Sequence, residues 1–169
     1  MKSAVTRRNF ATKFASMLST LGIGAAVLGK TAAAQTSPAQ DTGVQKLNYD
    51  GKPADGTQMI TSLIVHNGLI YISGQGANDA GDVQGADITS HTTKVMNNVK
   101  KLVEAGGGSM DSILQLTVYL GNLDFYDGMN KVFKTYFPHG GPARTTVSVA
   151  GVPGKSLLEI NCIAAVVRK

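Results

Sequence analysis

The sequence is poor in residues that build cross-links or metal centres. Cys162 is its only cysteine, which excludes an internal disulfide, and its strand-like surroundings indicate a small buried hydrophobic residue rather than a nucleophile. The three histidines, at positions 66, 91 and 139, lack metal-ligand spacing, so no zinc site is expected. Gly74-Gln75-Gly76 lacks the third glycine and the following helix of a dinucleotide-binding loop.

Acidic residues are absent from the N-terminal part of the chain. All eleven lie beyond Gln40, whereas five of the sixteen lysines and arginines lie in the first thirty residues. Removing these five leaves eleven cations against eleven acids, so the remainder is formally neutral and the net charge of +5 belongs to the N-terminus. A neutral domain lacks the basic surface expected of a nucleic-acid-binding protein.

The N-terminal apolar run, from Phe14 to Leu28, is interrupted by Ser, Thr and Gly and is shorter than the roughly 20 apolar residues of a membrane span. It follows the pair Arg7-Arg8 and precedes Ala32-Ala33-Ala34. This order predicts a signal peptide over residues 1–34, and the paired arginines resemble a twin-arginine export signal. We therefore expect a periplasmic protein without stable membrane association after cleavage. An uncleaved anchor helix is the alternative.

The mature chain is expected to start with an irregular segment. Residues 35–58 are rich in Gly, Pro, Asp, Gln and Thr, which predicts a linker or a loosely attached N-terminal arm. A single domain is expected over residues 59–169. It opens with a hairpin, because short β-type runs at 62–65 and 69–73 flank the turn signal His66-Asn67-Gly68.

Two stretches, 88–105 and 125–137, carry apolar residues at the three- and four-residue steps of an amphipathic helix. Three further strands are predicted at residues 112–120, 143–150 and 157–167. Alternation within the first of these places Leu114 and Leu116 on one face. The order β-β-α-β-α-β-β predicts an α+β fold, a mixed sheet with two helices on one face.

The last strand is apolar on both faces, because Ile163 and Ala165 alternate with Cys162 and Ala164. Two helices cover only one face of a sheet, so the other face needs another subunit. A homo-oligomer is therefore expected.

Arg144 is the strongest candidate for a binding residue. It stands at the start of a β-branched strand with no acidic neighbour in sequence. Its guanidinium is charged at every working pH and matches a carboxylate bidentately, so an anionic ligand is expected there. Strand alternation puts Thr146 on the same face. The alternative is an arginine at the solvent-exposed rim.

Glu159 lies between Leu158 and Ile160 in the most apolar strand. A carboxylate in such a place is costly unless it is paired or functional. The alternative to a catalytic role is an ordinary ion pair with Arg144 or Lys155.

Five ordered motifs together resemble the Rid (YjgF) family: residues 69–75, Val95 to Val99, Met129-Asn130, Gly141 to Arg144, and Leu158 to Ile160. The resemblance implies a chorismate-mutase-like fold, a homotrimer and ligand clefts between subunits. It also implies an enzyme similar to 2-iminobutanoate/2-iminopropanoate deaminases, which hydrolyse reactive 2-imino and 2-enamino acids to 2-keto acids and ammonia. Such chemistry needs no metal and no organic cofactor.

The resemblance also assigns site residues. Arg144 matches the arginine that grips the substrate carboxylate, and Glu159 matches the acid that positions or activates water. The positions that match residues lining the cleft are Ser73, Gly74, Asn130 and Thr146. Two positions depart from the family pattern: Ile60 stands where a tyrosine is frequent, and Thr146 where a cysteine is frequent.

Two other functions remain open. A non-catalytic trimer that binds a small 2-imino or 2-keto carboxylate would use the same cleft, and Ile60 favours it. An endoribonuclease or translation inhibitor is a third possibility, which the formal neutrality of the domain disfavours.

Overall fold

The computed structural model describes residues 43–77 and 87–167. The predicted signal peptide, residues 1–34, lies outside the described residues, as does the first part of the predicted arm. No helix within the described ranges is long and apolar enough to cross a lipid bilayer.

The described residues form one sheet, two α-helices and three short 3-10 helices. The strands are β1 (Gln45–Leu47), β2 (Leu63–His66), β3 (Leu69–Gly76), β4 (Ile113–Leu120), β5 (Ala143–Ser148) and β6 (Leu158–Ala165). The α-helices are α2 (Ile88–Ala105) and α3 (Tyr126–Tyr136), and the 3-10 helices are Met110–Ser112, Leu123–Phe125 and Pro153–Lys155.

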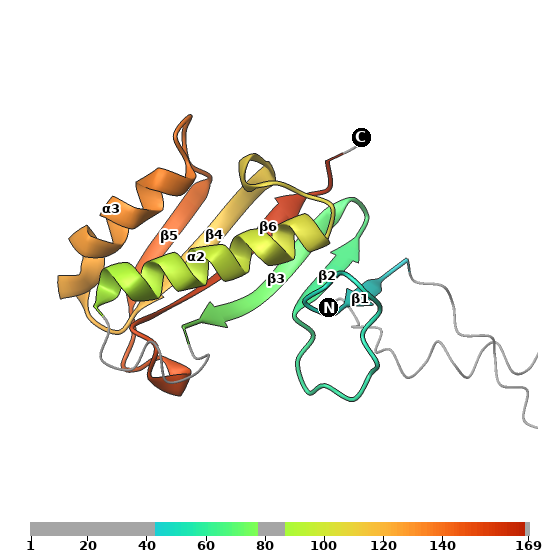
Figure 1. The fold of residues 1–169 in the computed structure, drawn as a ribbon, viewed down its shortest axis with the longest axis horizontal. Coiled ribbons are helices and arrows are strands. Elements are labelled where there is room, and N and C mark those ends of the chain that lie inside the picture. The colour runs from blue at the N-terminus through green and yellow to red at the C-terminus, as the bar shows by residue number, and fades with distance from the viewer. Residues whose placement is uncertain (1–42, 78–86, 168–169) are drawn as a thin grey trace, which may run out of the picture. The chain divides into compact units, whose positions relative to one another are not determined.

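The six strands follow the order β1-β2-β3-β6-β4-β5, and only the β4–β5 pair is parallel. Both helices lie across the same face of this sheet (Figure 1). The predicted α+β fold, a mixed sheet with two helices on one face, is confirmed.

Local chemistry explains the element boundaries. The β2–β3 hairpin turns at Asn67 and Gly68, which have φ of 50° and 76° as a two-residue hairpin turn with two left-handed residues requires. The carboxylate of Asp87 accepts a hydrogen bond from the backbone N–H of Ser90 (2.9 Å) and so caps α2. Gly107, with φ of 86°, follows the end of that helix.

The core lies between the helices and the sheet. Val99 of α2 and Ile70, Leu158 and Ile160 of the sheet are fully buried there. Burying each aliphatic side chain of this kind stabilises the fold by about 1.5–3 kcal/mol relative to exposure.

Two sequence-based expectations need correction. The domain begins before residue 59, because β1, within the predicted arm, pairs with β2 through the register of Gln45 with Val65. Leu114 does not share the buried face of Leu116: a register shift between Ile113 and Gln115 leaves its side chain 51% exposed. A bulge of this kind re-aims one side chain and restores the alternation beyond it.

The face of the sheet away from the helices is open. Along β6, Leu158, Ile160 and Cys162 are buried beneath the helices, whereas Glu159 and Ile163 are half-buried on the opposite face. No described element covers this open face. The apolar second face that motivated the expectation of an oligomer is therefore present, and the trimer itself remains a prediction.

Candidate functional site

A pocket on the open face contains Glu159. Its volume is about 230 Å³, and it is lined by Gly74 of β3, Tyr119 of β4, Glu159 and Asn161 of β6, and Val149, Gly151 and Pro153 of the following loops. Strand pairing assembles it, because Glu159 lies opposite Gly76 on one side and opposite Tyr119 on the other. Successive odd positions of β6 then put Asn161 beside Glu159.

Gly74 packs closely against the Glu159 side chain. A Cβ at Gly74 would overlap the Glu159 carboxylate, so a larger residue at this position would require the Glu159 side chain to move. The register between β3 and β6 shifts here, between Ile72 and Gln75. The irregularity therefore places Gly74 against the carboxylate of Glu159.

Ser73 is half-buried beside this pocket. Its hydroxyl donates to the carbonyl oxygen of Ser62 (3.1 Å) and accepts from the side-chain amide of Gln75 (3.2 Å). The strand serine therefore has fixed partners on the protein, and its orientation depends on its neighbours.

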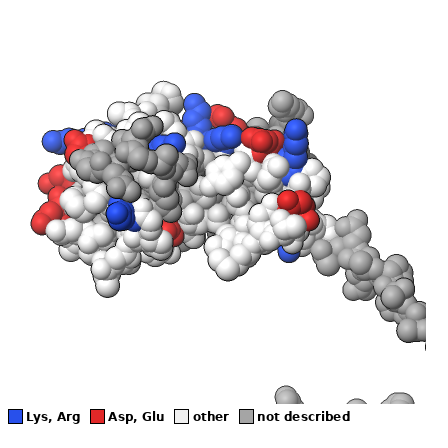
Figure 2. All heavy atoms as spheres, turned by 60° about the horizontal axis from the view of Figure 1, so that its bottom comes forward, with Lys and Arg blue, Asp and Glu red and all other residues white. Residues whose placement is uncertain are grey.

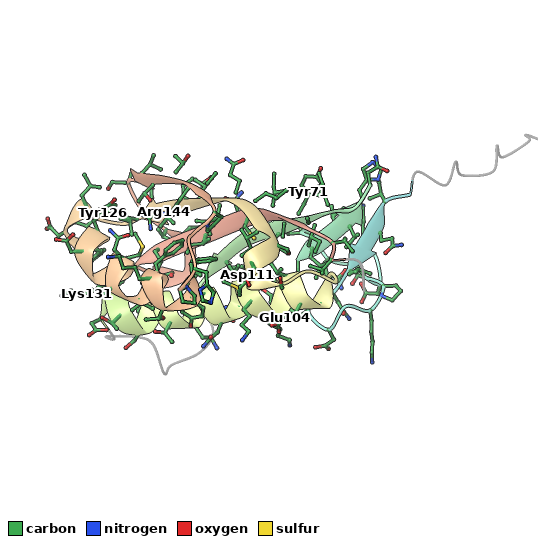
Figure 3. The ribbon with its side chains drawn as sticks, turned by 90° about the horizontal axis from the view of Figure 1, so that it is seen from above. Tyr71, Glu104, Asp111, Tyr126, Lys131 and Arg144 are labelled. Atoms are coloured by element: carbon green, nitrogen blue, oxygen red, sulfur yellow. The ribbon has the colours of Figure 1, made fainter. Side chains whose placement is uncertain are left out.

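Arg144 of β5 lies against α3. Its Cζ is 4.6 Å from the ring centroid of Phe133 and 5.9 Å from that of Tyr126, whose hydroxyl lies 3.5 Å from Nη2. Nη1 is 3.9 Å from the sulfur of Met129. Figure 3 shows Tyr126 and Arg144 together at one end of the sheet. Among the described residues, no carboxylate lies within 4.0 Å of this guanidinium.

Thr146 and Asn130 accompany Arg144. Thr146 follows it by two positions on β5, and both are half-buried. The hydroxyl oxygen of Thr146 is buried and has no hydrogen-bond partner, which is costly unless a ligand supplies one. Asn130 follows Tyr126 by four positions and precedes Phe133 by three on α3, so it lies on the helix face that holds Arg144.

The structure thus separates the predicted site residues into two groups. Arg144 and Thr146 pair with Leu116 and Val118, whose side chains are buried on the helix-covered face, whereas Glu159 lines the pocket on the open face. Glu159 also makes no ion pair with another described residue, so the alternative of an ordinary pair with Arg144 or Lys155 is not supported. Within the single chain, Arg144 does not line the pocket that contains Glu159.

Ile60, which stands where the family pattern has a tyrosine, is 63% exposed. It lines a second pocket of about 240 Å³ together with Leu47, Tyr49 and Ser62. Tyr49, from the predicted arm, is the aromatic residue of this pocket.

Sequence reasoning missed several residues. Asn161 could have been found, because it shares the strand face of Glu159, and its amide oxygen is buried without a partner. Tyr126 could have been found from its four-residue distance to Asn130. Tyr49 and Gln75 gave no local signal, since they meet only in the folded chain.

The sequence also predicts that the protein lacks a nucleophilic cysteine, a zinc site and a basic surface. Cys162 is 3% exposed, and burial raises the pKa of its thiol to about 12, which is unsuited to a nucleophile. Among the described residues, no three His, Cys, Asp or Glu side chains are grouped so as to hold a metal ion. On the face shown in Figure 2, basic and acidic side chains are interspersed rather than gathered into a basic patch.

The fold and the two groups of residues define a small α+β protein that has a guanidinium without a described carboxylate partner and, separately, a pocket lined by a glutamate. The family model described as Endoribonuclease L-PSP matches residues 57–166, and the chain belongs to this family, which includes the Rid (YjgF, RutC) proteins. Membership supports an activity of the Rid deaminase type.

Individual relatives agree with this assignment. A RutC family protein of Pyrococcus horikoshii is 36% identical over 98 residues, covering 57% of this chain and 78% of the relative. Reactive Intermediate Deaminase A of Arabidopsis thaliana is 29% identical over 106 residues, covering 62% of this chain and 57% of that protein. The crystal structure of the Escherichia coli YjgF gene product has a TM-score of 0.61 at 27% identity, covering 72% of this chain and 97% of that one.

Proposed function

We propose that the protein hydrolyses reactive 2-imino and 2-enamino acids to 2-keto acids and ammonia. The observation that carries this proposal is the guanidinium of Arg144, held on aromatic faces with no described carboxylate within 4.0 Å. Within the described part of the chain, its N–H groups make only the contacts of Nη1 with the Met129 sulfur and of Nη2 with the Tyr126 hydroxyl, and the guanidinium matches a ligand carboxylate as a bidentate fork.

The reaction requires little of the protein. A protonated 2-imino acid is already electrophilic at C2, so the site must hold the carboxylate, place a water at C2 and move a proton. In the proposed order of steps, Glu159 accepts a proton from the water as the water oxygen bonds to C2. The carboxyl group returns this proton to the nitrogen, and as the C–N bond breaks the carboxylate takes the proton of the new hydroxyl group. The 2-keto acid and ammonia are released, and ammonia carries away the second proton as ammonium. An enamino acid first takes up a proton at C3 to become the imine.

We propose that two protomers share each site. Arg144, Asn130 and Thr146 form one half, and Ser73, Gly74 and Glu159 form the other, on the open face. A homotrimer in which one protomer covers the open face of the next would bring a guanidinium to a Glu159 pocket. The unpartnered hydroxyl of Thr146 supports this arrangement, because a ligand in the shared cleft would supply its missing partner.

The test is release of ammonia from an imine that an amino-acid oxidase generates in situ. Wild type is expected to accelerate release, and Arg144→Ala and Glu159→Gln are each expected to lower kcat/KM by about 10²-fold. Lys131→Ala, which removes an exposed cation from α3, is the matched control and should behave as wild type. Full turnover by Arg144→Ala would contradict the proposal.

Ile60 favours a second candidate, binding of a 2-keto or 2-imino carboxylate without turnover. Calorimetric titration with 2-oxobutanoate distinguishes the two. Binding that depends on Arg144, in a wild type that does not release ammonia, would establish the second candidate and exclude the first.

We also propose export to the periplasm through the twin-arginine-like segment at residues 1–34. The support is the order of paired arginines, an interrupted apolar run and small residues in the sequence. Intact-mass analysis of the protein from its native cells should give a chain that starts near Gln35. A soluble cytoplasmic form that retains Met1 to Ala34 would refute export.

A further inference from the structure

We propose that Tyr49 is a positioning residue for the deaminase reaction: through Gln75, its hydroxyl fixes Ser73 and Gly74 at the Glu159 pocket. The inference rests on the proposed function. It also gives residues 43–58, which the sequence presents as a linker or loose arm, a role in catalysis.

Gln75 connects Tyr49 to the site. Its side chain is 2% exposed, and its amide nitrogen donates to the carbonyl oxygens of Ser73 (3.0 Å) and Gly74 (3.1 Å) and to the Ser73 hydroxyl (3.2 Å). Its amide oxygen accepts a hydrogen bond of 2.6 Å from the hydroxyl of Tyr49.

The Tyr49 hydroxyl favours one orientation of the Gln75 amide, the same orientation that the carbonyl oxygens of Ser73 and Gly74 favour. An amide has an oxygen that only accepts and a nitrogen that only donates. Reversing the amide of Gln75 would turn its oxygen toward the carbonyl oxygens of Ser73 and Gly74, which are also acceptors. The hydroxyl of Tyr49, by donating to the amide oxygen, stabilises the orientation in which the nitrogen faces both carbonyls.

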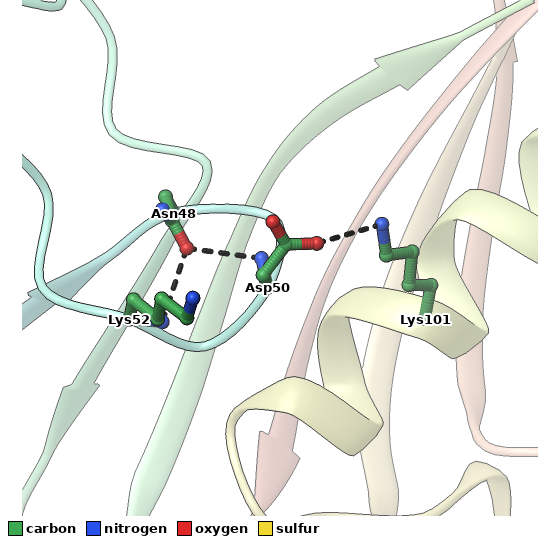
Figure 4. Close-up of polar contacts among 4 residues, drawn as sticks. All are labelled: Asn48, Asp50, Lys52 and Lys101. Atoms are coloured by element: carbon green, nitrogen blue, oxygen red, sulfur yellow. Dashed lines mark hydrogen bonds and ion pairs between the residues drawn. The ribbon is translucent and has the colours of Figure 1, made fainter.

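The segment that carries Tyr49 is itself anchored. The side-chain oxygen of Asn48 accepts from the backbone N–H groups of Asp50 and Lys52, each at 3.0 Å, and Asp50 pairs with Lys101 of α2 at 3.1 Å (Figure 4). The ammonium of Lys101 lies 5.9 Å from the ring centroid of Tyr49. A tight turn fixed to α2 therefore delivers the hydroxyl to Gln75.

Loss of the Tyr49 hydroxyl is expected to affect kcat rather than KM. Gly74 touches the Glu159 carboxylate, so a shift of residues 73–74 moves the group that handles the water and the proton. Arg144 lies on the other face of the protomer, against α3, and its hold on the ligand carboxylate is independent of Gln75. Small misplacements of reacting groups are costly to the chemical step.

The experiment is steady-state kinetics of full-length Tyr49→Phe with the imine assay. The variant keeps the ring and loses only the hydroxyl, and kcat is expected to fall about tenfold while KM stays within about twofold. Tyr136→Phe is the matched control: it removes a hydroxyl that donates over 2.8 Å to Asn97 between the two helices. This control should lose stability to unfolding to a similar extent and keep the wild-type kcat.

A double-mutant cycle with Gln75→Leu separates positioning from general destabilisation. If Tyr49 acts through Gln75, adding Tyr49→Phe to Gln75→Leu leaves kcat unchanged. Independent, multiplicative losses would overturn the inference, as would a Tyr49→Phe kcat equal to wild type. A wild type without activity would refute the proposed function, and this inference with it. An active wild type with an equally active Tyr49→Phe would refute this inference alone.

Discussion

Arg144 shows how a single side chain can be held ready for a ligand. Its guanidinium rests on the rings of Phe133 and Tyr126 and near the sulfur of Met129, none of which carries a charge. Cation–π contacts of this kind contribute about 0.5–2 kcal/mol each, and among the described residues the N–H groups of the guanidinium reach only the neutral Tyr126 hydroxyl and Met129 sulfur. The arginine is thus ordered without being neutralised, which is the state that a carboxylate receptor needs.

Cys162, another single residue, predicts how the free energy of unfolding depends on pH. Burial raises the pKa of its thiol from 9.0 to about 12, so between these values the folded state holds a proton that the unfolded state releases. The contribution to stability is complete below about pH 9 and is lost as pH rises toward 12. The difference in unfolding free energy between wild type and Cys162→Ala should therefore shrink from about pH 8 to about pH 11. A constant difference over this range would contradict the prediction.

Among the helices and strands, the features that the sequence predicts correctly are those that depend on neighbouring residues in the chain. Asn67-Gly68 specifies its hairpin turn without contacts from other parts of the chain, and Asp87 caps α2. The pairing of β1 with β2 and the bulge at Leu114 depend on a partner strand, and neither has a local pattern.

The same distinction applies to the site. Alternation along one strand places Arg144 with Thr146. The opposite facing of Arg144 and Glu159 depends on registers across β5, β4 and β6, which the sequence does not reveal. The contact of Tyr49 with Gln75 is likewise tertiary.

The contact between α2 and α3 gives a second prediction. A Cβ at Gly128 would lie 2.6 Å from Cγ2 of Ile88, the first residue of α2. Alanine normally favours a helix by about 1 kcal/mol over glycine, but overpacking costs about 1–3 kcal/mol. Gly128→Ala should therefore lower the urea midpoint of unfolding.

The clash has a matched rescue. Ile88→Ala removes the Cγ2 atom that the new methyl group would meet. In the Ile88→Ala background, Gly128→Ala should raise the urea midpoint, because only its helix propensity remains. A Gly128→Ala single variant more stable than wild type would show that α2 shifts freely relative to α3.

In the whole molecule, the open face of the sheet is the part that no described element covers. Tyr71, which is 39% exposed, points away from α2 on this face, and Val147 is 40% exposed next to Tyr119 (Figure 3). The Glu159 pocket, lined by Tyr119, Val149 and Pro153, opens on the same face. Covering the face with another protomer would bury them and close the pocket at the same time, so assembly and activity are expected to be linked.

Mixing inactive variants tests this link directly. If each site takes Arg144 from one protomer and Glu159 from another, every site of Arg144→Ala or of Glu159→Gln alone is impaired, whereas randomly mixed oligomers contain intact sites. Denaturing and refolding the two variants together in equal amounts should restore about a quarter of the wild-type ammonia release, because each half of a site is intact with a probability of about one half. Arg144→Ala refolded with Asn130→Ala is the control: both defects lie in the same half, so every site stays impaired. Recovery in this control, or none in the first mixture, would mean that the two halves of the site are not shared as proposed.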